Sequence, residues 1–97
     1  MEIHIRPAKF DDAQLLAKIF VYAIGEATAV SYLGETYEAV LTAICQSVGT
    51  QYSYRNALVA ECGGQCVGAI IGYDGAELHT LRAGTFSVIR RYKRGSE

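Results

Sequence analysis

The stretch at residues 60–75, AECGGQCVGAIIGYDG, holds the residues whose types and spacing come nearest to a chemical site. Two cysteines, Cys62 and Cys66, flank the pair formed by Gly63 and Gly64. Three structures are compatible with such a stretch. They are a glycine loop that binds phosphate, a cysteine site for a metal or for redox chemistry, and a β-hairpin without chemistry of its own.

The surroundings of the glycine pair favour the hairpin. A phosphate loop places its glycines ahead of a helix, where backbone N–H groups converge on the anion. Here the pair lies between two apolar runs, and no Lys-Ser or Lys-Thr follows it. With the glycines as a two-residue turn, Cys62 pairs with Gln65. Cys66 then pairs with Glu61 on the opposite face, so the two thiols point apart and neither a shared metal nor a disulfide is favoured.

The remaining titratable side chains also predict structure rather than chemistry. Cys45 lies near the apolar face of a predicted helix and is expected to be a small buried side chain. His4 is expected on the polar face of a strand, and His79 on a helix. The neighbours Asp11 and Asp12 are better explained as helix-capping residues than as an acid–base pair. We therefore predict no catalytic, cofactor-binding or metal-binding residue in this chain.

The elements that would position these residues follow from hydrophobic periodicity and turn residues. We predict an α/β (α+β) fold of order β-α-α-β-β-α, in which helices pack on a small mixed or antiparallel three-stranded sheet. The chain is expected to form one domain over residues 1–97, and residues 26–34 are compatible with either a helical turn or a loop. The predicted elements are a strand at 2–6, helices at 11–24 and 36–48, a hairpin at 57–73 and a helix at 76–92.

Individual residues set the expected ends of the helices. Asp11 is predicted to cap the first helix, with Gln14 as its capping-box partner. Val48 is predicted on the apolar face of the second helix, and Gly49 is predicted to end it. Gly84 weakens the prediction of the last helix, because glycine in a helix interior is unfavourable.

Composition and charge narrow the class of protein. Of 97 residues, 51% are hydrophobic and 20% are charged, which is typical of a globular chain. No run approaches the roughly 18–20 apolar residues that cross a bilayer. Three cysteines without an export signal predict a cytoplasmic protein with reduced thiols. Basic residues gather in residues 82–97, but the acidic remainder would repel phosphate, so nucleic-acid binding is not expected.

Two stretches resemble the GNAT family of N-acetyltransferases. The segment IHIRPAKFDDAQLLAKIF, residues 3–20, is similar to the family's first strand and acid-capped first helix. The hairpin ALVAECGGQCVGAIIGY, residues 57–73, is similar to the family's second and third strands, with a V-G step early in the third. The resemblance covers about residues 2–74, and the last helix resembles an insertion that some members place before a fourth strand.

This resemblance implies transfer of an acetyl group from acetyl-coenzyme A to a small amine. The family's coenzyme motif, (Q/R)-x-x-G-x-(G/A), lies on a fourth strand and the helix after it, and this chain contains no match. The resemblance therefore implies the N-terminal, acceptor-side part of an enzyme, inactive alone, with acetyl-coenzyme A bound by the full-length parent. The family shapes its acceptor site between the first two helices, which makes candidates of four residues here: Tyr22, Glu26, Tyr32 and Glu35.

A different class of function fits the same residues. The third strand, CVGAIIGY, has no lysine or proline to protect a sheet edge from pairing. The alternative is therefore a stand-alone binding or assembly module that oligomerises through this open strand. The expected partner is either the remaining C-terminal half of the fold or a second copy of the chain.

Overall fold

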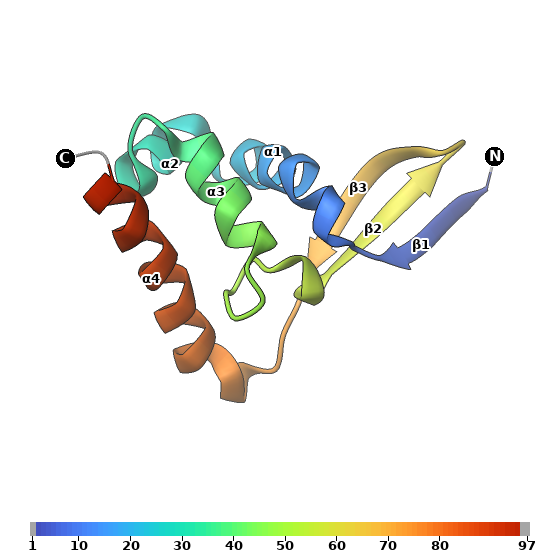
Figure 1. The fold of residues 1–97 in the computed structure, drawn as a ribbon. Coiled ribbons are helices and arrows are strands. Elements are labelled where there is room, and N and C mark those ends of the chain that lie inside the picture. The colour runs from blue at the N-terminus through green and yellow to red at the C-terminus, as the bar shows by residue number, and fades with distance from the viewer. Residues whose placement is uncertain (1, 96–97) are drawn as a thin grey trace.

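The computed structural model describes residues 2–95, which form four α-helices and one three-stranded antiparallel sheet (Figure 1). The strands, in their order across the sheet, are β1 (Ile3–Pro7), β2 (Ala57–Cys62) and β3 (Gln65–Ile71). The helices are α1 (Ala13–Ile24), α2 (Glu26–Leu33), α3 (Tyr37–Gln46) and α4 (Leu78–Gly95). The predicted α/β class with a small sheet is confirmed.

The β2–β3 hairpin turns at Gly63 and Gly64, whose φ angles are +60° and +81°. Positive φ at both central residues matches the twist of the flanking strands, and glycine adopts it without steric cost. The register pairs Cys62 with Gln65 beside the turn and sets Cys66 on the opposite face. The predicted turn and register are therefore confirmed.

Helices cover one face of the sheet, and the other face is open and apolar. On the covered face, Ala57 and Val59 are 3% and 0% exposed. The alternation of polar and apolar residues in β1 tells which side chains share a face of the strand, but it does not tell which face the helices cover. The isoleucines of β1 lie on the open side, and its polar residues lie on the other. The large exposed apolar side chains of this open sheet face are Ile3, Ile5, Leu58 and Ile70.

The predicted cap at Asp11 is wrong, because the residue directly ahead of α1 is Asp12, and the Asp12 side chain makes no hydrogen bond to the first amides of that helix. The Asp12 carboxylate accepts a hydrogen bond of 2.7 Å from the backbone N–H of Lys9. Both of its oxygens also accept from the Arg6 guanidinium, at 2.8 and 3.0 Å. Arg6 donates in addition to Glu61 on β2. Position 12 therefore serves the helix end and the sheet together, which local spacing alone does not predict.

The core forms where α1 and α3 lie side by side against the covered face of the sheet (Figure 1). The helix α3 ends at Gln46, earlier than predicted, because Ser47 adopts an extended conformation with ψ of 140°. Val48 consequently leaves the helix and is 54% exposed, although the sequence placed it on the apolar face. The core side chains with at most 2% exposure include Leu16, Val40, Ile44, Cys45 and Val59.

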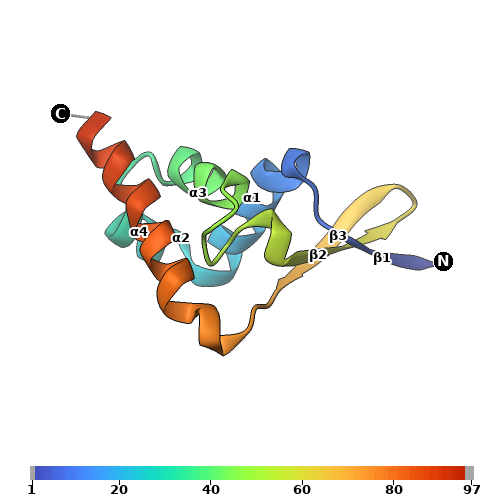
Figure 2. The ribbon, with the colours of Figure 1, turned by 60° about the horizontal axis from the view of Figure 1, so that its bottom comes forward.

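The helix α4 packs against α3 and extends away from the sheet (Figures 1 and 2). Its glycine has a steric reason, since a Cβ built on Gly84 would lie 2.0 Å from the carbonyl oxygen of Gly49. One residue on, the Thr85 hydroxyl accepts a hydrogen bond of 3.0 Å from the backbone N–H of Gln51. The glycine that weakened the helix prediction therefore permits α4 to cross this loop closely.

A bend separates α1 from α2, in the segment that the sequence left between a helical turn and a loop. Gly25 has φ of +91°, and the chain from 10–24 turns by 110° into α2. The helix α2 has eight residues and ends at Gly34, where φ is +88°. Within the described residues, no single helix is long and apolar enough to cross a bilayer, and 10–24 with 26–33 meet that length and composition only as this bent pair.

Candidate functional site

A cavity of about 250 Å³ lies where the four helices meet. Its walls come from segments far apart in the sequence: the end of α1, α2, α3, the loop at Tyr52, and α4. The buried lining residues are Phe20, Ala29, Leu41, Ile44 and Thr85, and the partly buried ones are Leu33, Tyr52 and Ile89. The exposed lining residues, which we call the rim, are Ile24, Thr28 and Tyr32.

The lining of this cavity is almost entirely apolar. None of its residues carries a charge. The rings of Phe20 and Tyr52 lie 5.5 Å apart between centroids at an interplanar angle of 51°. The Thr85 hydroxyl already donates to the backbone oxygen of Leu81 and accepts from the Gln51 N–H, so its hydrogen-bonding capacity is largely used. This lining suits an apolar group better than a charged one, and it contains no acid–base pair.

The four candidate acceptor residues do not converge. Tyr32 lines the cavity from α2, with 71% of its surface exposed at the rim. Tyr22 lies on α1, is 92% exposed and does not line the cavity. Glu26 begins α2, and Glu35 follows its end, both exposed. The structure thus places Tyr32 at the rim of the cavity and the other three on exposed surface outside its lining.

Glu26 also lies near Tyr37 at the start of α3, a contact that the sequence did not suggest. Partial burial and, after it, the negative charge of Glu26 raise the pKa of Tyr37 at the start of α3. A raised pKa means that the phenol keeps its proton more firmly. Tyr37 is consequently a poor general base in this position, and the pair does not supply acid–base chemistry.

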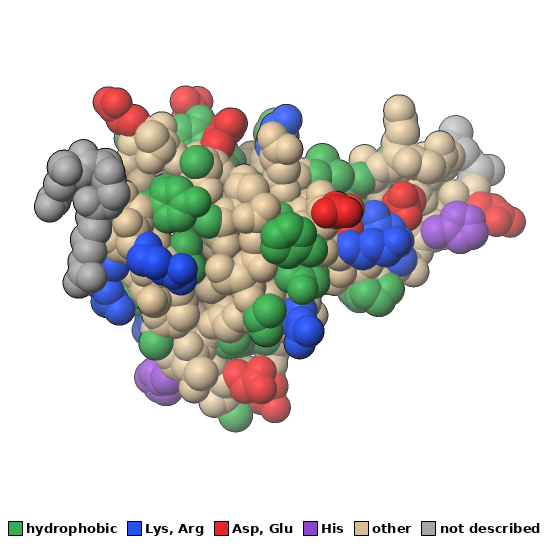
Figure 3. All heavy atoms as spheres, viewed as in Figure 1, with side chains coloured by type: hydrophobic (Ala, Val, Ile, Leu, Met, Phe, Trp, Pro, Cys, Tyr) green, Lys and Arg blue, Asp and Glu red, His purple; other side chains and the backbone are tan. Residues whose placement is uncertain are grey.

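The charge near α2 is negative. Residues 19–54 contain three acids, Glu26, Glu35 and Glu38, and no lysine or arginine. All three are exposed, and acidic side chains gather over the α2 and α3 end of the molecule in Figure 3. The opposing basic residues described on α4 are Arg82, Arg90 and Arg91, none of which lines the cavity. Acidic and basic side chains therefore both border this end of the helices (Figure 3).

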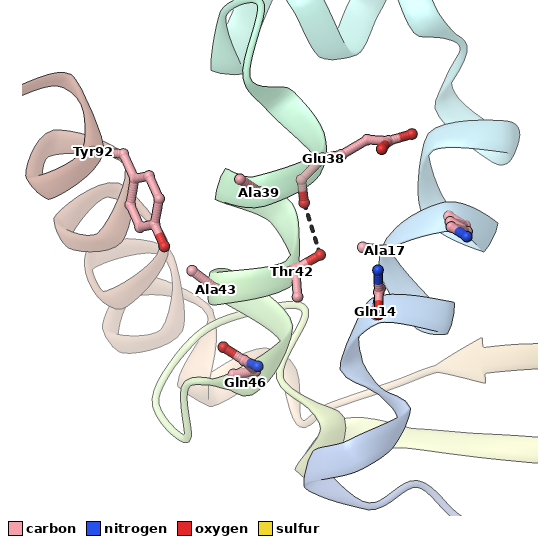
Figure 4. Close-up of a pocket in the computed structure, with 9 residues that line it drawn as sticks. Gln14, Ala17, Glu38, Ala39, Thr42, Ala43, Gln46 and Tyr92 are labelled. Carbon is pink, nitrogen blue, oxygen red and sulfur yellow. Dashed lines mark hydrogen bonds between the residues drawn. The ribbon is translucent and has the colours of Figure 1, made fainter. Parts of the chain in front are cut away.

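A second hollow, a groove of about 390 Å³, lies between α1, α3 and the end of α4 (Figure 4). Small residues such as Ala17 and Ala43 leave the space, and Tyr92 of α4 borders it opposite α1. The Thr42 hydroxyl donates to the backbone oxygen of Glu38 at 2.7 Å. The sequence does not reveal this groove, because its residues are small core positions such as Ala17 next to ordinary polar helix positions. The other lining residues are Gln14, Lys18, Ala39 and Gln46.

The cysteines and histidines form no common site. All three thiols are free, with Cys45 buried and the hairpin cysteines partly buried. Burial raises the pKa of Cys45 to about 12, which makes its thiol a weak nucleophile at neutral pH. His4 and His79 are both exposed. Among the described residues, no three His, Cys, Asp or Glu side chains come together as metal ligands.

The fold is similar to that of a known class of enzyme. A solved structure described as "The crystal structure of acetyltransferase" superposes with a TM-score of 0.76 at 21% sequence identity, over 93% of this chain. The chain spans 49% of that protein's length. No known protein family matches the sequence, and no curated protein matches it. The likeness establishes an acetyltransferase-like fold.

Proposed function

We propose that this chain is the N-terminal, acceptor-side part of a GNAT-type acetyltransferase, which moves an acetyl group from acetyl-coenzyme A to a small amine. The observation that carries the proposal is the fold likeness to about half of an acetyltransferase structure, which includes 93% of this chain. The resemblance of residues 3–20 and 57–73 to the family's first strands and helix supports the same assignment.

The open face and the free edge of the sheet support the proposal that this chain contacts a further half of the fold. A sheet that is covered on one face and apolar on the other fits the middle layer of a three-layer domain, since exposed apolar patches mark contact surfaces. Ile5 and Ile70 are 63% and 66% exposed on the open face. Within the described residues, β3 pairs with β2 alone, so its outer edge is free to pair. The remaining half of the fold would add a strand to β3 and cover the open sheet face.

The described residues do not fit acetyl-coenzyme A themselves. A pyrophosphate binds well at a helix N-terminus that is free of negative charge. Here the helix starts carry acids: Asp11 and Asp12 ahead of α1, Glu26 in α2, Glu38 in α3 and Glu77 ahead of α4. The coenzyme motif is also absent from the sequence. We therefore assign coenzyme binding to the remaining half and derive no chemical step from this chain alone.

Isothermal titration calorimetry with acetyl-coenzyme A tests this proposal. The 97-residue chain is compared with a chain extended to the natural stop of its reading frame. Binding by the extended chain only, followed by acetylation of an amine, is the expected result. Coenzyme binding by the 97-residue chain would contradict the assignment of the coenzyme site to the missing half. Absence of binding by both chains would contradict the acetyltransferase function.

The open edge also favours a second candidate function, an assembly module. The strand Gln65–Ile71 carries no charged side chain, and uncharged apolar edges pair readily with other strands. Sedimentation of the 97-residue chain at high micromolar concentration is expected to show self-association. A reading frame that stops after residue 97, together with a stable oligomer, would favour the module over the enzyme part. A monomer at that concentration would count against it.

A further inference from the structure

We propose that the free edge of β3 accepts a strand of the remaining half of the fold only along residues 68–71, and that a bulge at Val67 keeps the turn end of the hairpin out of this pairing. This inference rests on the proposed function, and it adds which backbone groups the partner strand uses. It follows from the register of the sheet, from the bulge and from the different chemistry of the two sheet edges.

The register shows which backbone groups of β3 are free. In an antiparallel pair, residues that exchange hydrogen bonds alternate with residues whose N–H and C=O groups point away from the partner strand. The Gly72 N–H donates to the Asn56 oxygen at 2.9 Å, which sets the phase of this alternation along β3. Every second residue back from Gly72, as far as Gly68, therefore bonds to β2. The residues between them, Ala69 and Ile71, present their backbone groups at the free edge.

The bulge ends this regular edge. On β2, Ala60 pairs with Gly68, and the next residue pairs with Cys66. Val67 is thus an extra residue on β3, and an extra residue interrupts the alternation and increases the local twist of its strand. Bulges of this kind turn part of a sheet edge away from other strands. A regular partner strand can therefore follow residues 68–71 but loses its phase at Val67.

The opposite edge of the sheet, on β1, is protected by its residues. The Ala8 N–H donates to the Ala57 oxygen at 3.0 Å, which sets the phase along β1 in the same way. The backbone groups of Ile5 and Pro7 consequently point away from β2. Pro7 has no N–H to offer, and proline at such a position is typical of a strand that stays at an edge. β3 has neither a proline nor a charged side chain, so we expect the partner strand on β3 and not on β1.

The side chains of β3 fit a strand with neighbours on both sides. Ala69 and Ile71 pack against the core on the covered face, whereas Ile70 is 66% exposed on the open face. A short run that is apolar on both faces is typical of a fully buried strand. The chain spans 49% of the similar acetyltransferase structure, so a segment of about the same length as this chain completes that fold. This segment is the occupant that we assign to the edge.

Amide hydrogen exchange measured by NMR on ¹⁵N-labelled protein tests the inference. The 97-residue chain at low concentration is compared with the chain extended to its natural stop. Extension should slow the exchange of the Ala69 and Ile71 amides by at least about 100-fold. The Ile70 amide, which bonds to β2, should be protected in both chains. The amides of Cys66, beyond the bulge, and of Ile5, on the β1 edge, should exchange at the same rate in both chains.

A matched pair of proline variants tests the same phase independently. Ala69→Pro removes an N–H that points away from β2, so the 97-residue chain should keep its hairpin. In the extended chain this variant should speed the exchange of the Ile71 amide by at least about tenfold. Ile70→Pro removes an N–H that bonds to β2, and it should lower the urea midpoint of the 97-residue chain more than Ala69→Pro does.

Three results would overturn the inference. The first is unchanged exchange of the Ala69 and Ile71 amides on extension. The second is slower exchange of the Cys66 or Ile5 amide on extension, because the bulge or the β1 edge would then not limit pairing. The third is protection of Ala69 and Ile71 that rises with the concentration of the 97-residue chain and not on extension. That result would assign the edge to a second copy of the chain.

Failure here can be told apart from failure of the proposed function, since hydrogen exchange needs neither coenzyme nor turnover. If the extended chain acetylates an amine while the Ala69 amide exchanges as before, the assigned pairing is wrong and the acetyltransferase function stands. If Ala69 and Ile71 become protected but the extended chain neither binds acetyl-coenzyme A nor transfers an acetyl group, the pairing stands and the proposed function is wrong.

Discussion

Replacing Gly84 by alanine tests how α4 is held against the loop after α3. Two effects of this substitution oppose each other. Alanine favours a helix interior over glycine by about 1 kcal/mol. The new Cβ, however, would lie 2.0 Å from the Gly49 carbonyl oxygen, whereas ordinary contacts begin at 3.4 Å. The loop and the helix must therefore separate by roughly 1.4 Å at this point.

We expect the steric effect to outweigh the gain in helix propensity. The three heavy atoms nearest to that Cβ are backbone atoms of Gly49 and Thr50, which cannot rotate away as a flexible side chain would. Separation would loosen the packing of Leu81 and Val88, which are 8% and 3% exposed, and the hydrogen bond from Gln51 to Thr85. Overpacking of this kind costs about 1–3 kcal/mol, and loss of a hydrogen bond to a buried group adds about 1 kcal/mol. We expect a net loss of about 1–3 kcal/mol in the free energy of unfolding after the helix-propensity gain is subtracted.

Urea unfolding followed by circular dichroism measures this change. Gly72→Ala is the matched control, because no atom lies within 4 Å of its added Cβ and its φ is not positive. That variant shares the entropic effect of glycine replacement on the unfolded chain and should be neutral or slightly stabilised. A Gly84→Ala variant as stable as Gly72→Ala, or more stable, would show that α4 does not cross the Gly49 loop at this distance.

The other predictions concern the ion network, the core and the thiols. The pKa of Asp12 is lowered by its hydrogen bonds to Arg6, so the carboxylate stabilises the fold above about pH 3.8 and this contribution is lost as pH falls through its folded value. Asp12→Asn should cost about 1–2 kcal/mol at pH 7 and flatten acid unfolding, unlike Asp11→Asn. Ile44→Ala should cost about 2–5 kcal/mol in urea unfolding, whereas Ile5→Ala on the open sheet face should cost little in the monomer. Mass spectrometry after iodoacetamide treatment should find both hairpin cysteines alkylated before Cys45.

The hairpin was predictable because its information is local. Two adjacent glycines between apolar runs specify a tight turn, and the turn then fixes the register of Cys62 opposite Gln65. The helix at 11–24 was predictable for a similar reason, since its apolar residues recur at helical spacing. The end of α3 was not, because Ser47 turns to an extended conformation although its backbone N–H and its hydroxyl both still donate to the Ala43 carbonyl, and no residue type at this position announces the turn.

Features that depend on contacts between residues far apart in the chain could not be predicted from the sequence. Asp11 and Asp12 are equivalent in local spacing, and the choice between them is made by Arg6 on β1. The cavity requires α2 and α4 to lie across α3, so Thr28 and Ile89 share a space although no sequence pattern connects them. Of the four candidate acceptor residues, the sequence could name the segment around α2, but only tertiary packing distinguishes Tyr32 from its neighbours.

The cavity between the helices and the open face of the sheet are formed by different parts of the fold. The cavity is bounded by helices alone, and its far wall is held by the close crossing of α4 at Gly84. The open sheet face and the free edge of β3 lie on the other side of the core, where α4 makes no cover (Figures 1 and 2). The packing of the helices and the pairing of the sheet should therefore be separable. A change at Gly84 that loosens α4 should leave the open sheet face and the free edge of β3 unaltered.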